Sequence, residues 1–172
     1  MNDVRQAVLD AIRLRRSIRH YRADPVNEED LQTILEAGQW APSGLNNQPW
    51  RFVVVRGAET KNKIADETRY QQIIRDAPII IVVFIDNTVS YDRVKDCQAM
   101  GACLQNMWLA IHALSLGGVW IGEILKNKER VAEILATPEA FELMAVLAIG
   151  HPQHRQQTSH RKPLSDLVFK IL

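Results

Sequence analysis

Basic side chains gather at two places in the sequence. The first cluster comprises Arg15, Arg16, Ser17 and Arg19, and the second comprises Arg161 and Lys162. Guanidinium groups form bidentate hydrogen bonds with phosphates and with the carbonyl edge of a heterocycle. The alternative for the first cluster is a solvated helix end, where the helix dipole favours cations. Both interpretations are open at this point, and any bound anion would be small because the net charge is only +1.

An amide-rich loop spans residues 41–49. Its polar and conformationally restricted residues are Pro42, Ser43, Asn46, Asn47, Gln48 and Pro49. Two prolines restrict the backbone, so the loop can hold amide donors and acceptors in fixed directions, as the edge of a heterocycle requires. A further segment, residues 117–123, carries Gly117, Gly118 and Gly122, which would let the backbone approach a flat ligand.

Several common cofactor and metal motifs are absent from the sequence. No GxGxxG follows a predicted strand and no GxxxxGK[ST] occurs, so neither a Rossmann site nor a P-loop is indicated. His151, His154 and His160 have no zinc spacing, and we predict no metal site. Cys97 and Cys103 are expected to be buried small apolar residues of a reduced, cytoplasmic protein. The small net charge also argues against a nucleic-acid binder.

Apolar periodicity predicts helices and strands in an order that is not a regular βαβ alternation. We expect helices over residues 4–15, 28–38, 59–67, 93–116 and 128–135, and strands over residues 50–56, 79–85, 119–121 and 143–149. The continuously apolar run 79–85 is typical of a central strand buried on both faces. Gly117 and Gly118 are expected to close the long helix. The pattern predicts a single α+β domain over residues 1–172, with two or three layers around a mixed or antiparallel sheet flanked by helices.

The stretch from residue 98 to residue 122 contains no Asp, Glu, Lys or Arg. It is long enough to span a bilayer, but polar residues such as Gln105 and Asn106 interrupt it, so we predict no membrane segment. A helix that is apolar nearly all round must be buried on all sides. So short a chain has difficulty covering such a helix alone, which predicts a subunit interface and a homodimer.

Four segments together resemble the nitroreductase-like FMN reductases. They are RRSIRHY (15–21), APSGLNNQPWRF (41–52), GVWIGE (118–123) and HRKPLSDLV (160–168), in this order along nearly the whole chain. The first two motifs are specific and the last two are supportive. The resemblance implies an α+β sandwich whose long helices pair in an intertwined homodimer, with a non-covalent FMN at each subunit interface.

The resemblance also implies roles for individual residues. Arg15, Arg16, Ser17 and Arg19 would meet the FMN phosphate, ribityl chain and pyrimidine edge. The site would also be lined by Pro42, Ser43, Asn46 and Gln48, some of them from the partner subunit. The backbone of Ile121 and Gly122 would face the flavin N5, and Arg161 would bind the phosphate. Ser159 stands where the family commonly has a basic residue, and Lys162 is the candidate to replace it.

The activity implied by the resemblance is a two-step transfer of hydride from NAD(P)H to the flavin and then to a small oxidised acceptor, such as a nitroaromatic or a quinone. Because the flavin carries this chemistry, no catalytic side chain is expected. Many members carry a helical insertion between the central strand and the long helix, which covers the active site. Here only residues 86–92 lie between these elements, so we expect a more open pocket or one covered by a different segment. The alternatives are a non-catalytic FMN-binding or storage protein and a specialised relative such as a dehalogenase or enoate reductase.

Overall fold

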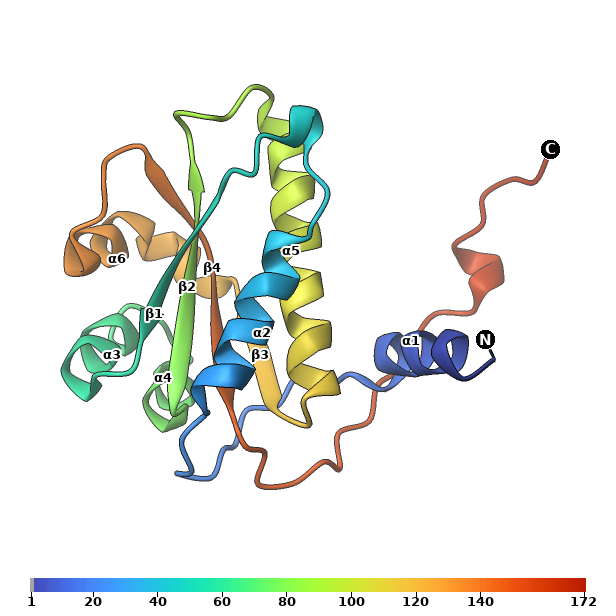
Figure 1. Ribbon diagram of the computed structural model, residues 1–172, viewed down its shortest axis with the longest axis horizontal. Coiled ribbons are helices and arrows are strands. Elements are labelled where there is room, and N and C mark those ends of the chain that lie inside the picture. The colour runs from blue at the N-terminus through green and yellow to red at the C-terminus, as the bar shows by residue number, and fades with distance from the viewer. Residues whose placement is uncertain (1) are drawn as a thin grey trace.

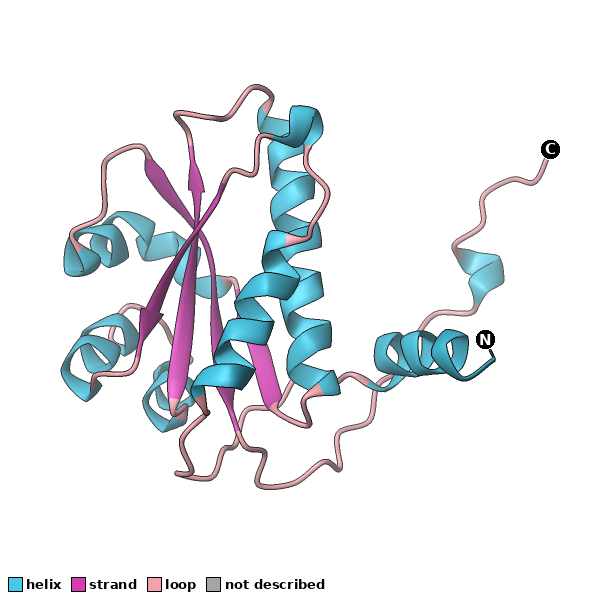
Figure 2. Cartoon of the chain, in the orientation of Figure 1, coloured by secondary structure: helices cyan, strands magenta, loops and turns pink. Residues whose placement is uncertain are grey.

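The computed structural model describes residues 2–172 (Figures 1 and 2). The helices are α1 (Asn2–Leu14), α2 (Glu28–Gln39), α3 (Ala58–Ala65), α4 (Gln71–Asp76), α5 (Arg93–Ala113) and α6 (Lys128–Leu135). The strands are β1 (Trp50–Val55), β2 (Ile79–Asp86), β3 (Gly117–Ile121) and β4 (Phe141–Gly150). Short 3-10 turns lie at Gly44–Asn46, Glu123–Asn127 and Leu164–Asp166.

The four strands form one sheet in the order β1-β2-β4-β3. Each neighbouring pair is antiparallel, and Val82 of β2, for example, lies opposite Val53 of β1 and Val146 of β4. Figure 1 shows α2 and α5 on one face of this sheet and α3, α4 and α6 on the other. The prediction of an α+β fold is therefore confirmed. Of the alternatives that the sequence left open, the structure has three layers rather than two, and an antiparallel rather than a mixed sheet.

The central strand β2 supplies both halves of the core. All eight of its residues are buried. Ile79, Ile81, Val83 and Ile85 pack into the cluster that includes α2 and α5, whereas Ile80, Val82 and Phe84 pack with α3, α4 and α6. Successive side chains of a strand point to opposite faces, and burial of each large apolar side chain contributes about 1.5–3 kcal/mol. The predicted strand buried on both faces is confirmed.

The end of the long helix differs from the prediction. Helix α5 stops at Ala113, three residues before the predicted end, because Ser115 adopts a left-handed backbone with φ 58°. Gly117 does not close the helix; it begins β3, where a side chain would lie 2.6 Å from Ile18 Cγ2. Helix α4 was not predicted, because it has only six residues and no side-chain cap.

Two arms project from the layered body. Figure 1 shows α1 and the C-terminal tail extending away from the sheet on the same side. Helix α1 confirms the first predicted helix, but its apolar stripe is exposed, with Val4 72% and Val8 56% accessible. In the tail, Phe169 is 100% exposed and Ile171 88% exposed. Neither arm buries these apolar side chains within its own chain.

Candidate functional site

The segment that carries the first motif docks against the edge of the sheet. Ile18 N donates to Gly118 O at 3.0 Å, and Ser17 forms a parallel bridge with Gly118 of β3. The hydroxyl of Tyr21 lies 2.7 Å from Ile18 O and 2.9 Å from Ala148 O. Burial raises the pKa of this phenol, so it stays a neutral hydrogen-bonding anchor for the segment.

The C-terminal tail returns beside the same segment. Arg22 N donates to His151 O at 2.8 Å, and Gln153 N donates to His20 O at 3.1 Å. Further along the tail, Arg155 donates to Ser115 O at 2.6 Å and so satisfies a carbonyl just after the end of α5. These bonds bring residues far apart in sequence together next to β3.

A basic cavity results from this crossing. It has a volume of about 350 Å³ and is lined by Arg15, Arg16, Ser17, Arg19, Gln157, Thr158, Ser159 and Arg161. Among the described residues that line it there is no carboxylate. The structure thus brings together the whole first cluster and Arg161, as the resemblance implied, and adds a polar run from the tail.

Three guanidinium nitrogens of Arg15 and Arg16 in this cavity lack hydrogen-bond partners in the part of the chain that the structure describes. Within residues 2–172, Arg15 Nε, Arg15 Nη1 and Arg16 Nε are buried without a hydrogen-bond acceptor. The Arg15 guanidinium stacks on the ring of Trp108 at 3.8 Å, while Arg16 Nη1 donates to Arg13 O at 2.7 Å. Burial, together with the charges of Arg161 and Arg16, lowers the pKa of Arg15. A buried donor without an acceptor is unfavourable, so these residues fit a phosphate-bearing ligand that supplies anionic oxygens.

A second hollow adjoins the first through Arg19. It has a volume of about 230 Å³ and is lined by Arg19, Tyr70, Ile73, Val119, Trp120, Ile121, Gly122 and Glu123. Glu123 fixes its rim by accepting from Thr68 Oγ1 at 2.6 Å and pairing with Lys126 at 2.7 Å. Hydrogen bonds from Lys126 and Thr68 lower the pKa of Glu123 to about 2, so this carboxylate holds its neighbours as an anion.

The amide-rich loop lies at the other end of α5. Pro42 and Ser43 line a third hollow of about 300 Å³ beside residues of α5. The loop is tightly folded: Leu45, Asn46 and Gln48 have φ of 54°, 53° and 45°, and Ser43 Oγ accepts from Gln48 N at 3.0 Å. A left-handed conformation costs a residue other than glycine about 1–3 kcal/mol, and such strain is concentrated at functional sites.

One chain does not bring the two predicted halves of the site together. The loop touches α5 at Asp96, through Asn47, whereas Arg15 touches α5 at Trp108. Twelve helical residues separate these points, which is about 18 Å along the axis. Within the described chain Asn46, Gln48 and Lys162 line none of these three hollows, and their roles remain predictions.

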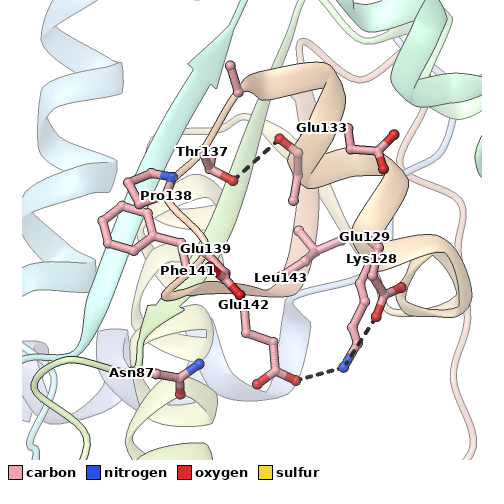
Figure 3. Close-up of a pocket in the computed structure, with 12 residues that line it drawn as sticks. Asn87, Lys128, Glu129, Glu133, Thr137, Pro138, Glu139, Phe141, Glu142 and Leu143 are labelled. Carbon is pink, nitrogen blue, oxygen red and sulfur yellow. Dashed lines mark hydrogen bonds and ion pairs between the residues drawn. The ribbon is translucent and has the colours of Figure 1, made fainter.

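Another cavity, of about 460 Å³, lies between α6 and the start of β4 (Figure 3). It is larger than the basic cavity, but its charged lining residues are one lysine, Lys128, and four glutamates, Glu129, Glu133, Glu139 and Glu142, so it is acidic and would repel a phosphate. Lys128 Nζ lies 3.1 Å from Glu142, which also pairs with Arg93 at 3.0 Å. It contains none of the predicted site residues, and we therefore place the candidate site at the basic cavity.

The sequence predicted neither a membrane segment nor a metal site, and both predictions can be compared with the structure of residues 2–172. No helix in this range is long and apolar enough to cross a membrane. No group of three or more His, Cys, Asp or Glu side chains in the described chain is arranged to hold a metal ion.

Comparison with known proteins identifies the family of this chain. The profile of the Nitroreductase family matches residues 12–71 and 65–151, which together cover more than half of the sequence. The chain belongs to the nitroreductase family. The matched residues include the first motif, the amide-rich loop and β3, and so most of the site described above.

Three relatives of this nitroreductase are informative. A Desulfovibrio desulfuricans protein assigned to the nitroreductases and solved in complex with FMN is 48% identical, with a TM-score of 0.91 and 96% of each chain covered. A Methanothermobacter thermautotrophicus protein assigned as an NADH dehydrogenase or NAD(P)H nitroreductase is 35% identical over 156 residues, covering 88% of this chain and 80% of its own. The NADPH-flavin oxidoreductase of Vibrio harveyi is 30% identical over 174 residues, covering 94% and 72%.

Sequence reasoning missed part of this nitroreductase site. Gln157 and Thr158 line the basic cavity, and Trp108 supports Arg15. The polar run just before Arg161 was a usable signal, because an exposed tail of Gln, Thr and Ser can present donors to an anion. No sequence signal linked Trp108 to Arg15, because that contact depends on how α5 is rotated about its axis.

Proposed function

We propose that this protein is an FMN-dependent oxidoreductase that transfers reducing equivalents from NAD(P)H to a small oxidised acceptor, such as a nitroaromatic or a quinone. The observation that carries the proposal is the cavity lined by arginines without a carboxylate, in which buried guanidinium nitrogens have no acceptor among residues 2–172. The names of the relatives, which include an FMN complex and flavin oxidoreductases, support the same cofactor. A cytoplasmic location stays a prediction.

We assign the basic cavity to the FMN phosphate and ribityl chain. Arg15 and Arg161 would form charge-assisted bonds to the phosphate, which are stronger than neutral hydrogen bonds. Arg19 lines both hollows, so its charge lies where it would stabilise an anionic flavin ring. The backbone of Ile121 and Gly122 borders the second hollow, where the ring would lie. Bound FMN would supply the redox chemistry, and we assign no catalytic side chain.

We propose further that the active unit is a homodimer. Helix α5 is only half-buried along the face that includes Gln105, Trp108 and Leu109, and the apolar stripes of both arms are exposed. If two copies of α5 pack antiparallel, the amide-rich loop of one chain approaches the basic cavity and the adjoining second hollow of the other, so that Pro42 and Ser43 reach the flavin ring. That arrangement would overcome the separation of about 18 Å within one chain, and it would bury the arms.

Steady-state kinetics test the proposed activity. We expect NADH or NADPH to be oxidised in the presence of p-benzoquinone or a nitroaromatic. The kinetics should be ping-pong, because nicotinamide and acceptor bind in turn. Free FMN at the same concentration is the control. A rate no higher than this control, in a preparation that retains FMN, would identify a non-catalytic flavin-binding protein and contradict the proposal.

A further inference from the structure

A buried carboxylate lies directly beneath the amide-rich loop. Asp96, in the first turn of α5, is fully buried. Its Oδ1 accepts from Asn47 Nδ2 at 2.8 Å, and its Oδ2 accepts from Ser90 Oγ at 2.6 Å and Tyr91 N at 3.0 Å. Both carboxylate oxygens are therefore in use, and one of them is committed to the loop.

The contact with Asn47 fixes the orientation of that side chain. Asn47 Nδ2 also donates to Val89 O at 3.1 Å. Because Asp96 and Val89 both present acceptors, only the NH2 group of Asn47 can face them. The opposite atom, Asn47 Oδ1, stays buried without a partner among residues 2–172. An amide held in this single orientation ties the middle of the loop to α5.

The neighbouring segment closes onto the same loop. Tyr91 packs against Gly44 so closely that a side chain at position 44 would lie 1.7 Å from the Tyr91 hydroxyl. On the other side, Arg51 donates to Gln48 O at 3.1 Å and pairs with buried Asp86 at 2.7 Å. Contacts thus fix the loop just before and at the end of its run of left-handed residues, and the bond from Asn47 to Asp96 fixes it to α5.

We propose that Asp96 is a positioning residue, which acts through Asn47 to hold the amide-rich loop in the conformation that binds the flavin ring. The inference rests on the proposed function, in which Pro42 and Ser43 reach that ring. The backbone conformation at three loop residues is unfavourable, so without the Asp96 contact the loop relaxes to other conformations. Flavin binding must then order the loop again. The apparent affinity for flavin falls in proportion to the fraction of molecules whose loop is in the binding conformation.

Flavin titration of four proteins tests this role. They are the wild-type homodimer, Asp96→Asn, Asn47→Ala and the double variant. The substitution Asp96→Asn keeps the size of the side chain but replaces one acceptor by a donor. We expect each single variant to bind FMN and riboflavin about tenfold more weakly, by the same factor for both ligands. The equal loss is expected because the loop reaches the ring, which both ligands share.

The double variant separates positioning from general stability. If Asp96 acts through Asn47, the double variant should lose no more affinity than Asp96→Asn alone. Lys61→Met is the matched control: it removes another buried charged side chain, whose ammonium donates to Ala77 O on the opposite face of the sheet, and it should leave flavin affinity unchanged. Hydrogen exchange should be faster in residues 41–49 of the ligand-free Asp96→Asn protein.

The outcomes are distinct. Wild-type affinity in Asn47→Ala, additive losses in the double variant, or an equal loss in Lys61→Met would each overturn the positioning role while the proposed function stands. If Asp96→Asn does not fold, Asn47→Ala alone decides, because it leaves the bonds from Ser90 and Tyr91 to Asp96 in place. A wild-type protein that binds neither flavin would instead refute the proposed function, and with it this inference.

Discussion

Replacing Arg161 by alanine should weaken FMN binding without affecting the fold. The side chain is exposed at the basic cavity, and within residues 2–172 its guanidinium donates only to the adjacent His160 O, at 2.9 Å. Its positive charge also lies near Arg15, whose pKa is lowered first by burial and then by Arg161. Removing one of these like charges should therefore leave the stability of the ligand-free protein unchanged or slightly higher.

The size of the effect follows from the type of bond that is lost. A hydrogen bond to a charged group contributes about 1.5–3 kcal/mol, so Arg161→Ala should lower the affinity for FMN about ten- to a hundredfold. Riboflavin lacks the phosphate and should bind the variant and the wild type equally well. Because the cavity is open to solvent, the difference between the two ligands should shrink as the salt concentration rises.

The assay is a titration of flavin fluorescence with ligand-free protein. Lys63→Ala is the control, because it removes the same charge from an exposed residue of α3 that pairs with Glu59 and does not line the cavity. Equal losses of FMN and riboflavin in Arg161→Ala would place this arginine on the ring rather than the phosphate. No loss with either ligand, or an equal FMN loss in Lys63→Ala, would refute the assignment of the cavity.

Two further predictions concern assembly and stability. Leu109→Glu places a charge on the half-buried face of α5. Because an unpaired buried charge is strongly unfavourable, light scattering should show monomeric or insoluble protein. An intact dimer of normal stability would contradict the proposed interface. Burial raises the pKa of Asp96, but its hydrogen bonds from Ser90, Asn47 and the backbone of Tyr91 and Asp92 together outweigh burial and lower the pKa. Its carboxylate therefore stabilises the fold at neutral pH, and that stability is lost as the pH falls below about 4. In urea unfolding, the difference between wild type and Asp96→Asn should therefore be largest near pH 7 and shrink towards pH 3; a difference independent of pH would show that Asp96 is not ionised in the folded protein.

The sequence predicted those elements whose side-chain pattern repeats. The seven-residue apolar run of β2 and the charge-free stretch of α5 are long and regular, so their type and place were evident. The end of α5 was missed because Ser115, and not a glycine, takes the left-handed conformation there. Helix α4 was missed because six residues hold too little periodicity to distinguish a helix from a loop.

The candidate site was predicted by residue type but not by arrangement. The arginines of the first cluster and Arg161 were identified as anion-binding residues, yet their meeting depends on the tail bonds at Arg22 and Gln153. Such contacts join residues more than a hundred positions apart, and no local pattern encodes them. The role of Asn47 was hidden in the same way, because its partner Asp96 resembles an ordinary charged residue in the first turn of a helix.

The most direct test of the proposed flavin chemistry is the ultraviolet–visible spectrum of the purified protein, followed by anaerobic addition of NADH and NADPH. We expect a yellow protein that releases about one FMN per chain on denaturation, and whose flavin absorbance is bleached by at least one of the two nicotinamides and restored by an oxidised acceptor. A colourless protein that does not take up added FMN, or a bound flavin that neither nicotinamide reduces, would contradict the proposed chemistry.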